Sequence, residues 1–337
     1  MIGGLLALLS AVTFAYANAS VRRGVITGTV LQAVAISLVV GLPFFLLAMW
    51  PSGGFAALTA FDAQAVVLLI VAGVIHFALA RYCNYRATKA MGANLVAPVQ
   101  QYSLIITLVL AVVWLGEAIT FLRLLGIACV IAGPALTLGP GKKGAAAPAS
   151  ASTYQPAYGE GYLFALLSAV GFGISPILVG MAFAHKGLAA GIAGGFISYL
   201  AATLAIALPL LLPGQWKSFR TIERDTANWF MISGVAVAIS QMTRYMALTI
   251  APVSVVSPIQ RLSLVFRLHF GAMLNPDHEV FGGRIVAGTV ISLLGAVALS
   301  VSVEGLVEAL PETLSEALHL PASLAAVLGW SWRFPWP

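Results

Sequence analysis

Four ionisable side chains stand within one strongly apolar stretch, residues 244–270. They are Arg244, Arg261, Arg267 and His269. A charged side chain at the middle of a membrane costs at least about 2.5–3.5 kcal/mol, so such residues usually face a polar cavity or a partner. Arginine can bind a carboxylate or a phosphate through two parallel hydrogen bonds. The stretch predicts a binding site for a solute with an acidic group, with Arg261 and its neighbour Gln260 as first candidates. The alternative for Arg261 is a structural arginine that binds backbone carbonyls.

A weaker copy of this stretch occurs about 160 residues earlier. Its matched positions pair Tyr85 with Tyr245, Pro98 with Pro258, and Gln100 with Gln260. Gln101 then mirrors Arg261. We expect Gln100 and Gln101 to close the same cavity from the other side, the alternative being hydrogen bonds between helices. The two prolines are expected to shape their helices, because proline lacks a backbone donor.

Two further polar clusters interrupt apolar segments. One comprises Arg244 and Tyr245, with Gln241 one turn before them, and the other comprises His76, Arg81 and Tyr85. Arg81 and Tyr85 are one helical turn apart, so both side chains can face one cavity. These residues are candidates for substrate binding. The alternative for each arginine is a position near a helix end, from which the long side chain reaches the membrane surface.

Glu117 and His269 are the candidates for proton coupling. Histidine titrates near neutral pH, and Glu117 is an acid at a span end. Each has a plain alternative: Glu117 as a structural acid at a helix junction, and His269 as a side chain that reaches the membrane interface.

The composition places these residues in a membrane protein. The chain has 337 residues, of which 60% are hydrophobic and only 8% charged, whereas soluble domains have roughly 25% charged residues. The net charge of +6 concerns membrane orientation rather than nucleic-acid binding. Cys83 and Cys129 both lie in apolar segments, so we expect neither a disulfide framework nor a metal site. We also expect no cofactor, no ATP-driven transport and no enzyme activity, because the sequence contains no P-loop, HExxH or GxSxG motif.

A transmembrane helix needs about 20 mostly apolar residues, and on that scale the chain contains ten spans. They cover about 2–20, 27–49, 64–84, 93–115, 120–138, 161–184, 188–212, 228–249, 253–273 and 283–303. Residues 139–160 are rich in Gly, Pro and Ala and read as a flexible linker between two five-span repeats, 1–138 and 161–303. The tail, 304–337, has glutamates on one helical stripe, leucines on another and a Trp-rich end, which predicts an interfacial helix, the alternative being disorder.

The two halves repeat along their whole length. Residues 7–12 and 165–170 both read ALLSAV, and Gly126 and Gly133 correspond to Gly288 and Gly295. Because each half has an odd number of spans, the halves must insert with opposite orientation. The sequence therefore predicts an all-α membrane protein built from two inverted five-helix repeats. Many secondary transporters have this architecture, with the substrate site near the midplane between the repeats.

At residues 1–303 the chain resembles the ten-span, EamA-like carriers of the drug/metabolite transporter superfamily. The resemblance rests on ALLSAV, on the Tyr-x-Ala segment at Tyr85 with Pro98 downstream, on residues 115–117 (Leu-Gly-Glu), and on the paired glycines of the fifth and tenth spans. It implies a central cavity and the export or exchange of small metabolites by alternating access, in a multi-pass protein of the cell (inner) membrane. The chain departs from the family pattern at residues 275–277, which read Asn-Pro-Asp where the first half has Leu-Gly-Glu.

These observations favour a secondary carrier for a small polar organic metabolite, such as an amino acid or an organic anion. The partners expected are the substrate and the lipid bilayer, without nucleic acid or ATP, and ten spans could form a complete carrier as a monomer. A non-transporting subunit of a membrane assembly with a carrier-like fold is the alternative. The resemblance implies cytoplasmic termini, whereas the excess of Lys and Arg after odd-numbered spans favours the opposite orientation.

Overall fold

The computed structural model describes residues 2–115, 119–137, 155–183, 187–212, 221–250 and 259–300, together with Gly214, Phe219, Val256 and residues 331–332. The elements in the first half are α1 (Ile2–Val25), α2 (Val30–Ser52), α3 (Gly54–Ala57), η1 (Leu58–Ala60), α4 (Ala63–Gly73), η2 (Val74–Ala80), α5 (Arg81–Met91), α6 (Ala93–Val99), α7 (Tyr102–Leu115), β1 (Ile119–Thr120) and α8 (Phe121–Thr137). Those that follow are α9 (Tyr158–Phe183), α10 (Gly187–Leu210), α12 (Arg224–Ile250), α14 (Ser263–Leu274), α15 (Gly283–Ser300) and β2 (Ser331–Trp332).

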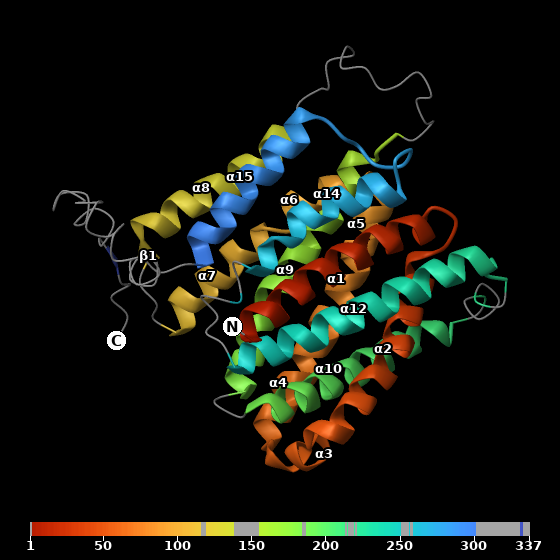
Figure 1. The fold of residues 1–337 in the computed structure, drawn as a ribbon, viewed down its shortest axis with the longest axis vertical. Helices are drawn as coiled ribbons and strands as arrows, with labels where there is room; N and C mark the ends of the chain where they lie inside the picture. Colours follow the sequence, from red (N-terminus) through yellow and green to blue (C-terminus); the bar gives the residue numbers. More distant parts are fainter. Residues whose placement is uncertain are drawn as a thin grey trace.

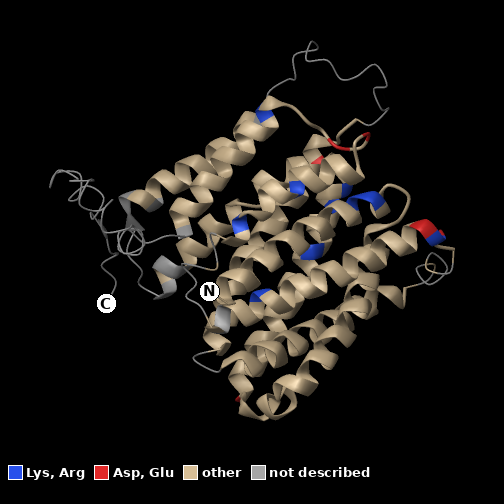
Figure 2. Cartoon of the chain, in the orientation of Figure 1, with Lys and Arg blue, Asp and Glu red and all other residues tan. Residues whose placement is uncertain are grey.

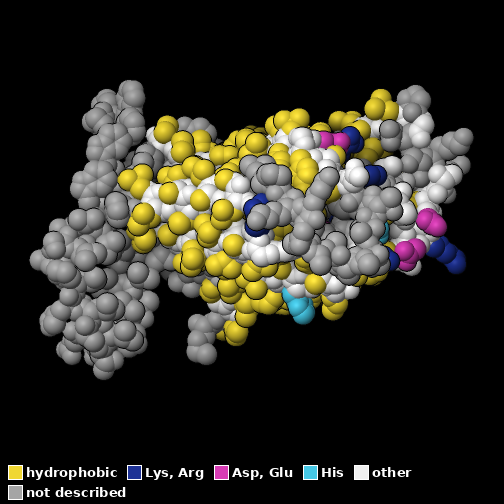
Figure 3. Space-filling view, turned by 90° about the horizontal axis from the view of Figure 1, so that it is seen from above, with side chains coloured by type: hydrophobic (Ala, Val, Ile, Leu, Met, Phe, Trp, Pro, Cys, Tyr) yellow, Lys and Arg dark blue, Asp and Glu magenta, His cyan; other side chains and the backbone are white. Residues whose placement is uncertain are grey.

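Six helical stretches among the described residues are long and apolar enough to cross a membrane. They are Ile2–Val25, Val30–Ser52, Ala63–Met91, Ala93–Leu110, Tyr158–Phe183 and Gly187–Leu210, and shorter apolar helices cover Leu124–Leu136 and Gly283–Leu299. Hydrophobic side chains cover much of the described surface in Figure 3, while the acidic side chains drawn there lie toward one end. The helical class is confirmed, and the full set of ten spans stays a prediction.

Local signals in the sequence explain where the second and third spans begin. Thr29 and Gln32 form a capping box at the start of α2, in which each side chain accepts from the other residue's backbone N–H. Asp62 accepts from the backbone N–H of Ala65 at the start of α4. Both caps satisfy backbone donors that the first helical turn leaves without partners.

The helices of the two halves pack against one another in a reciprocal manner (Figure 1). Helix α1 lies along α12, and α9 of the second half lies along α4 and α5 of the first. Likewise α1 contacts α14, and α9 contacts α7. Since the sequence repeat relates α1 to α9, each pairing has its counterpart with the halves exchanged. This exchange is what a two-fold axis between the halves produces. It supports the predicted inverted repeat, which stays a prediction.

Helices α8 and α15 show the same reciprocity at single residues. A Cβ on Gly126 would lie 2.9 Å from the carbonyl oxygen of Gly295, and a Cβ on Gly295 would lie 2.7 Å from that of Gly126. A Cβ on Gly133 would lie 2.7 Å from the carbonyl oxygen of Gly288 and would also meet the Ser292 side chain. The glycines therefore let two backbones approach more closely than any side chain would allow.

Three helix irregularities lie deep in the bundle. The third span changes to a π-helix at η2, a form that often marks functional positions. The fourth span breaks between α6 and α7, where Gln101 and Leu104 donate to carbonyls only three residues earlier. The ninth span has a similar turn at Leu262, whose N–H donates to Ile259. Predicted site residues flank all three irregularities.

The structure differs from the sequence expectation at the end of the first span. The predicted span stops near residue 20, with Arg22 in a loop. Instead α1 continues to Val25, and Arg22 is buried. The reason is that its guanidinium meets carbonyl groups and a carboxylate of the protein rather than water. Glu117, Pro258 and most of the linker and tail lie outside the described residues, although Ser331 and Trp332 pair with Thr120 and Ile119 in a short antiparallel ladder.

Candidate functional site

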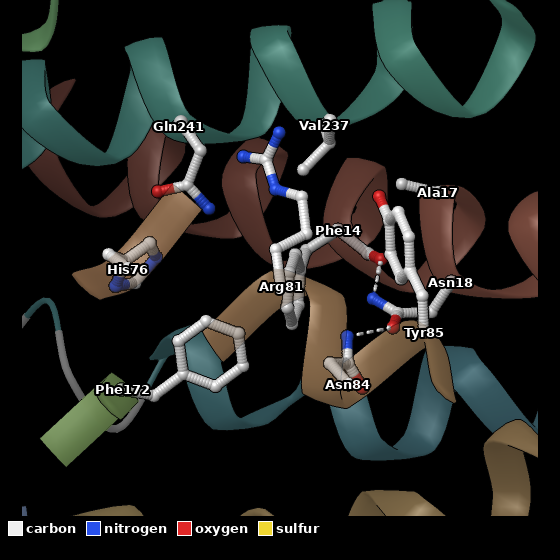
Figure 4. Close-up of a pocket in the computed structure, with 10 residues that line it drawn as sticks. All are labelled: Phe14, Ala17, Asn18, His76, Arg81, Asn84, Tyr85, Phe172, Val237 and Gln241. Atoms are coloured by element: carbon white, nitrogen blue, oxygen red, sulfur yellow. Dashed lines mark hydrogen bonds between the residues drawn. The ribbon is translucent and has the colours of Figure 1, made fainter. Parts of the chain in front are cut away.

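A polar pocket lies between α1, the third span and α12 at the centre of the bundle. Its lining combines three aromatic rings, a guanidinium, an imidazole and three amides, contributed by Phe14, Ala17, Asn18, His76, Arg81, Asn84, Tyr85, Phe172, Val237 and Gln241 (Figure 4). The part of the pocket that the centre of a water molecule can occupy has a volume of about 10 Å³. This is space for about one water molecule. The pocket is therefore small in this conformation.

Arg81 is the cationic group of the pocket and is 3% exposed. Its Nη1 donates to the Ser37 hydroxyl at 3.3 Å and its Nη2 to the Tyr199 hydroxyl at 2.9 Å. The guanidinium also lies 5.0 Å from the ring centre of Phe77 and 5.2 Å from that of Tyr199. Neutral hydroxyls and rings orient the guanidinium without cancelling its charge. The pocket can therefore bind an anionic group.

His76 stands in the π-helical segment beside Arg81. Its Nδ1 lies 2.6 Å from the Ser175 hydroxyl, and its ring packs against Phe77 and Phe172. Since Ser175 belongs to α9, this hydrogen bond joins the two halves of the chain at the pocket. Figure 4 shows His76 and Phe172 on one side of Arg81, with Asn18, Asn84 and Tyr85 on the other.

A chain of hydrogen bonds leads from the pocket to a second buried arginine. Asn84 donates to Asn18 at 3.1 Å, Gln100 donates to Asn84 at 2.7 Å, and Arg267 donates to Gln100 at 2.9 Å. All four side chains are buried. Gln100 thus connects to the pocket at the break of the fourth span. It does so through Asn84 rather than by lining the pocket itself.

Arg244 and Arg261 form a further cationic pair toward the N-terminal end of α1. Gln260, which precedes Arg261, donates to Ser10 at 3.3 Å, and Ser10 donates to the Ser240 carbonyl, one turn before Arg244. Arg244 is close enough to repel Arg261 and to act electrostatically on His76. Within the described residues, the buried Nε atoms of both arginines have no hydrogen-bond partner.

The remaining predicted residues lie elsewhere. Gln101 is buried, but its amide donates to the Ala97 carbonyl in the preceding helix α6. Tyr245 is buried against Phe183 and shares a hydrogen bond with Ser198. His269 points out of the bundle, so it has no place in the pocket. The described residues contain no cluster of three or more His, Cys, Asp and Glu that could hold a metal ion.

Sequence reasoning missed Asn18 and Asn84, which line the pocket, and Arg22 and Glu279, which form a buried ion pair. The repeat offset of 162 residues that relates Gly126 to Gly288 would also have matched Glu117 with Glu279. Asparagines inside apolar helices give no comparable periodic signal.

Comparison with known proteins agrees with this geometry. Residues 1–139, from α1 to the end of α8, match the EamA-like transporter family. Over these residues, the chain is similar to the EamA-like transporter family. A crystal structure of another protein superposes with a TM-score of 0.51 at 18% identity, over 94% of this chain and 97% of that chain. At that identity the likeness shows a shared fold. A search of curated proteins finds no match.

The match over the first half of the chain and the long apolar helices point to a multi-pass membrane protein of the transporter type.

Proposed function

We propose that this EamA-like protein is a secondary carrier for a small polar organic metabolite with an acidic group, such as an organic anion or an amino acid. It works as an exporter or exchanger in the cell (inner) membrane, as a monomer, by alternating access of the central pocket. The single observation that supports the choice of substrate is the uncancelled charge of Arg81 in a pocket otherwise lined by amides, hydroxyl groups and rings.

The distribution of arginines along the pathway supports an anionic solute. The arginines lie at successive positions along α1. Gln260, which precedes Arg261, contacts Ser10, and the Arg267 guanidinium lies over the Phe14 ring. Arg22 belongs to α1 itself, near its C-terminal end. From Ser10 to Arg22 a helix rises about 18 Å. Figure 2 shows Lys and Arg positions within the bundle. Among the acids that the structure describes, Glu279 is the fully buried one. A solute anion would supply the missing negative charge in the centre.

Alternating access is supported by the irregular third, fourth and ninth spans. Interrupted helices recur at the substrate sites of inverted-repeat transporters, because their freed backbone groups and local bends can face the substrate. Here the interruptions flank His76, Gln100 and Arg261.

The test is a thermal-shift screen of the purified full chain against anionic, zwitterionic and cationic metabolites. A ligand that binds the folded state raises its melting temperature. We expect hits among anionic or zwitterionic solutes that disappear in Arg81→Gln and persist in Arg86→Gln. Arg86 is a suitable control because it stands five residues later and pairs with Glu160 at the surface. A set of cationic hits that Arg81→Gln leaves unchanged would contradict the proposal.

A further inference from the structure

Arg244 of α12 and Arg261, just before α14, form a cationic pair that has no acidic partner within the described residues. The ion pairs found in that part of the chain engage Arg22 and Arg86 instead. Arg244 repels Arg261, and the buried Nε atom of each lacks a hydrogen-bond partner among the described residues. Both side chains keep part of their surface open. The pair is therefore placed to receive an anionic group.

The other two arginines of this series find acceptors on the chain itself. Arg22 lies 3.6 Å from the Glu279 carboxylate and donates to the Thr88 carbonyl at 3.0 Å. Arg267 donates to Gln100 at 2.9 Å and is attracted by Glu279. Both of these arginines are buried. They have the surroundings of structural arginines, and the cationic pair does not.

Two helices place the cationic pair next to the central pocket. On α1, Ser10 accepts from Gln260 at 3.3 Å and stands four residues before Phe14, which lines the pocket. On α12, Arg244 stands three residues after Gln241, which also lines the pocket. One helical turn rises about 5.4 Å. Along both helices the pair therefore lies about one turn beyond the pocket lining, so the two places can bind one solute.

Gln241 and His76 lie on the side of the pocket that faces the cationic pair. Figure 4 shows both side chains on the same side of Arg81, and Arg81 and Arg244 both act electrostatically on His76. The buried Oε1 of Gln241 has no partner among the described residues. An amide at this place can hydrogen-bond a polar group in the middle of a solute.

We propose that the substrate carries two separate acidic groups, as in a dicarboxylate, one of which binds Arg81 while the other binds Arg244 and Arg261. This inference rests on the proposed function and narrows it. An amino acid would bring an ammonium group to one of the two cationic places, where like charges repel it. A monocarboxylate would leave one of them without a counter-charge. A dicarboxylate offsets both.

The experiment compares ligands that differ by one charge and have nearly the same shape. Succinate is paired with succinamate, and glutarate with glutaramate, in which an amide replaces one carboxylate. Each ligand is titrated onto the purified full chain at about pH 7, where free carboxyl groups are ionised. The rise of the melting temperature with ligand concentration gives the affinity. We expect at least one dicarboxylate to bind about tenfold or more tightly than its monoamide.

The variants assign this advantage to the cationic pair. Arg244→Gln and Arg261→Gln should each remove most of the advantage of the dicarboxylate and leave binding of the monoamide largely unchanged. Arg81→Gln should weaken the binding of both ligands. Arg86→Gln should change neither, because Arg86 pairs with Glu160 at the surface.

Three results would overturn the inference. They are equal affinities within every ligand pair, an advantage that survives in the double variant of Arg244→Gln and Arg261→Gln, and dicarboxylates that leave the melting temperature unchanged. Each of them leaves a carrier for a solute with a single acidic group standing. Binding that does not depend on Arg81 would count against the proposed function instead. If an arginine variant fails to fold, the ligand pairs still decide the matter in the unaltered chain.

Discussion

At the scale of single residues, the pocket depends on polar side chains that satisfy one another. Asn84 is central, because it donates to Asn18 and accepts from Gln100 while lining the pocket. A buried polar group that loses its partner costs about 1–3 kcal/mol. The geometry of the pocket is therefore tied to the stability of the fold around it.

Asn84→Leu should lower the stability of the protein, because it leaves the amides of Asn18 and Gln100 without this partner. We expect a loss of about 1–3 kcal/mol per orphaned group, visible as a clear drop in melting temperature without ligand. Gln64→Leu is the control, since Gln64 is an exposed amide on α4. Equal melting temperatures for the two variants would show that the Asn84 hydrogen bonds do not stabilise the fold.

At the scale of helices, contact between the two halves relies on glycine where backbones meet. Gly126 and Gly133 of α8 face Gly295 and Gly288 of α15 in a reciprocal pattern. Gly180 of α9 is also within a helix, but a Cβ there would meet nothing within 4 Å. The two kinds of glycine allow a matched comparison.

Gly133→Ala should destabilise the protein, because the new methyl group would collide with Ser292 and the Gly288 carbonyl. Overpacking of this kind costs about 1–3 kcal/mol. Gly180→Ala should be neutral or stabilising, since alanine favours a helix by about 1 kcal/mol over glycine. Thermal unfolding in detergent measures both, and a Gly133→Ala protein as stable as Gly180→Ala would refute the close α8–α15 contact.

At the scale of the whole molecule, the two halves bury their surfaces chiefly against each other. The pairs α1–α12, α9–α5 and α8–α15 all cross between halves, and so do the His76–Ser175 hydrogen bond and the Arg22–Glu279 ion pair. Each half by itself would expose these polar and small-residue surfaces to lipid.

The halves should consequently assemble when produced as two polypeptides, 1–146 and 147–337. We expect an affinity tag on one half to recover the other in equal amounts, and each half produced alone to be lost by aggregation or degradation. Gly133→Leu should reduce recovery of the complex. Stable, monodisperse recovery of one half by itself would show that the halves fold independently.

The sequence by itself determined the membrane class, the repeat and the charged positions. Composition and span length are properties of the chain, because lipid demands apolar helices whatever their packing. The prediction of Arg81, His76 and Tyr85 as neighbours followed from helical spacing within one span, and all three line the pocket. Arg267 lies in the apolar stretch 244–270, but its place beside Gln100 depends on two spans meeting in the fold.

Only the tertiary structure decided which charges are partnered. Arg22, which the sequence places in a loop, is buried against Glu279, and His269, a sequence candidate for proton coupling, is exposed. The sequence by itself does not distinguish Glu279 from the other acids. The physical reason is that a charge in a span is tolerated through its surroundings, and those come from helices up to 257 residues apart along the chain, as with Arg22 and Glu279. Hydropathy shows that such a charge is costly, whereas packing decides what offsets the cost.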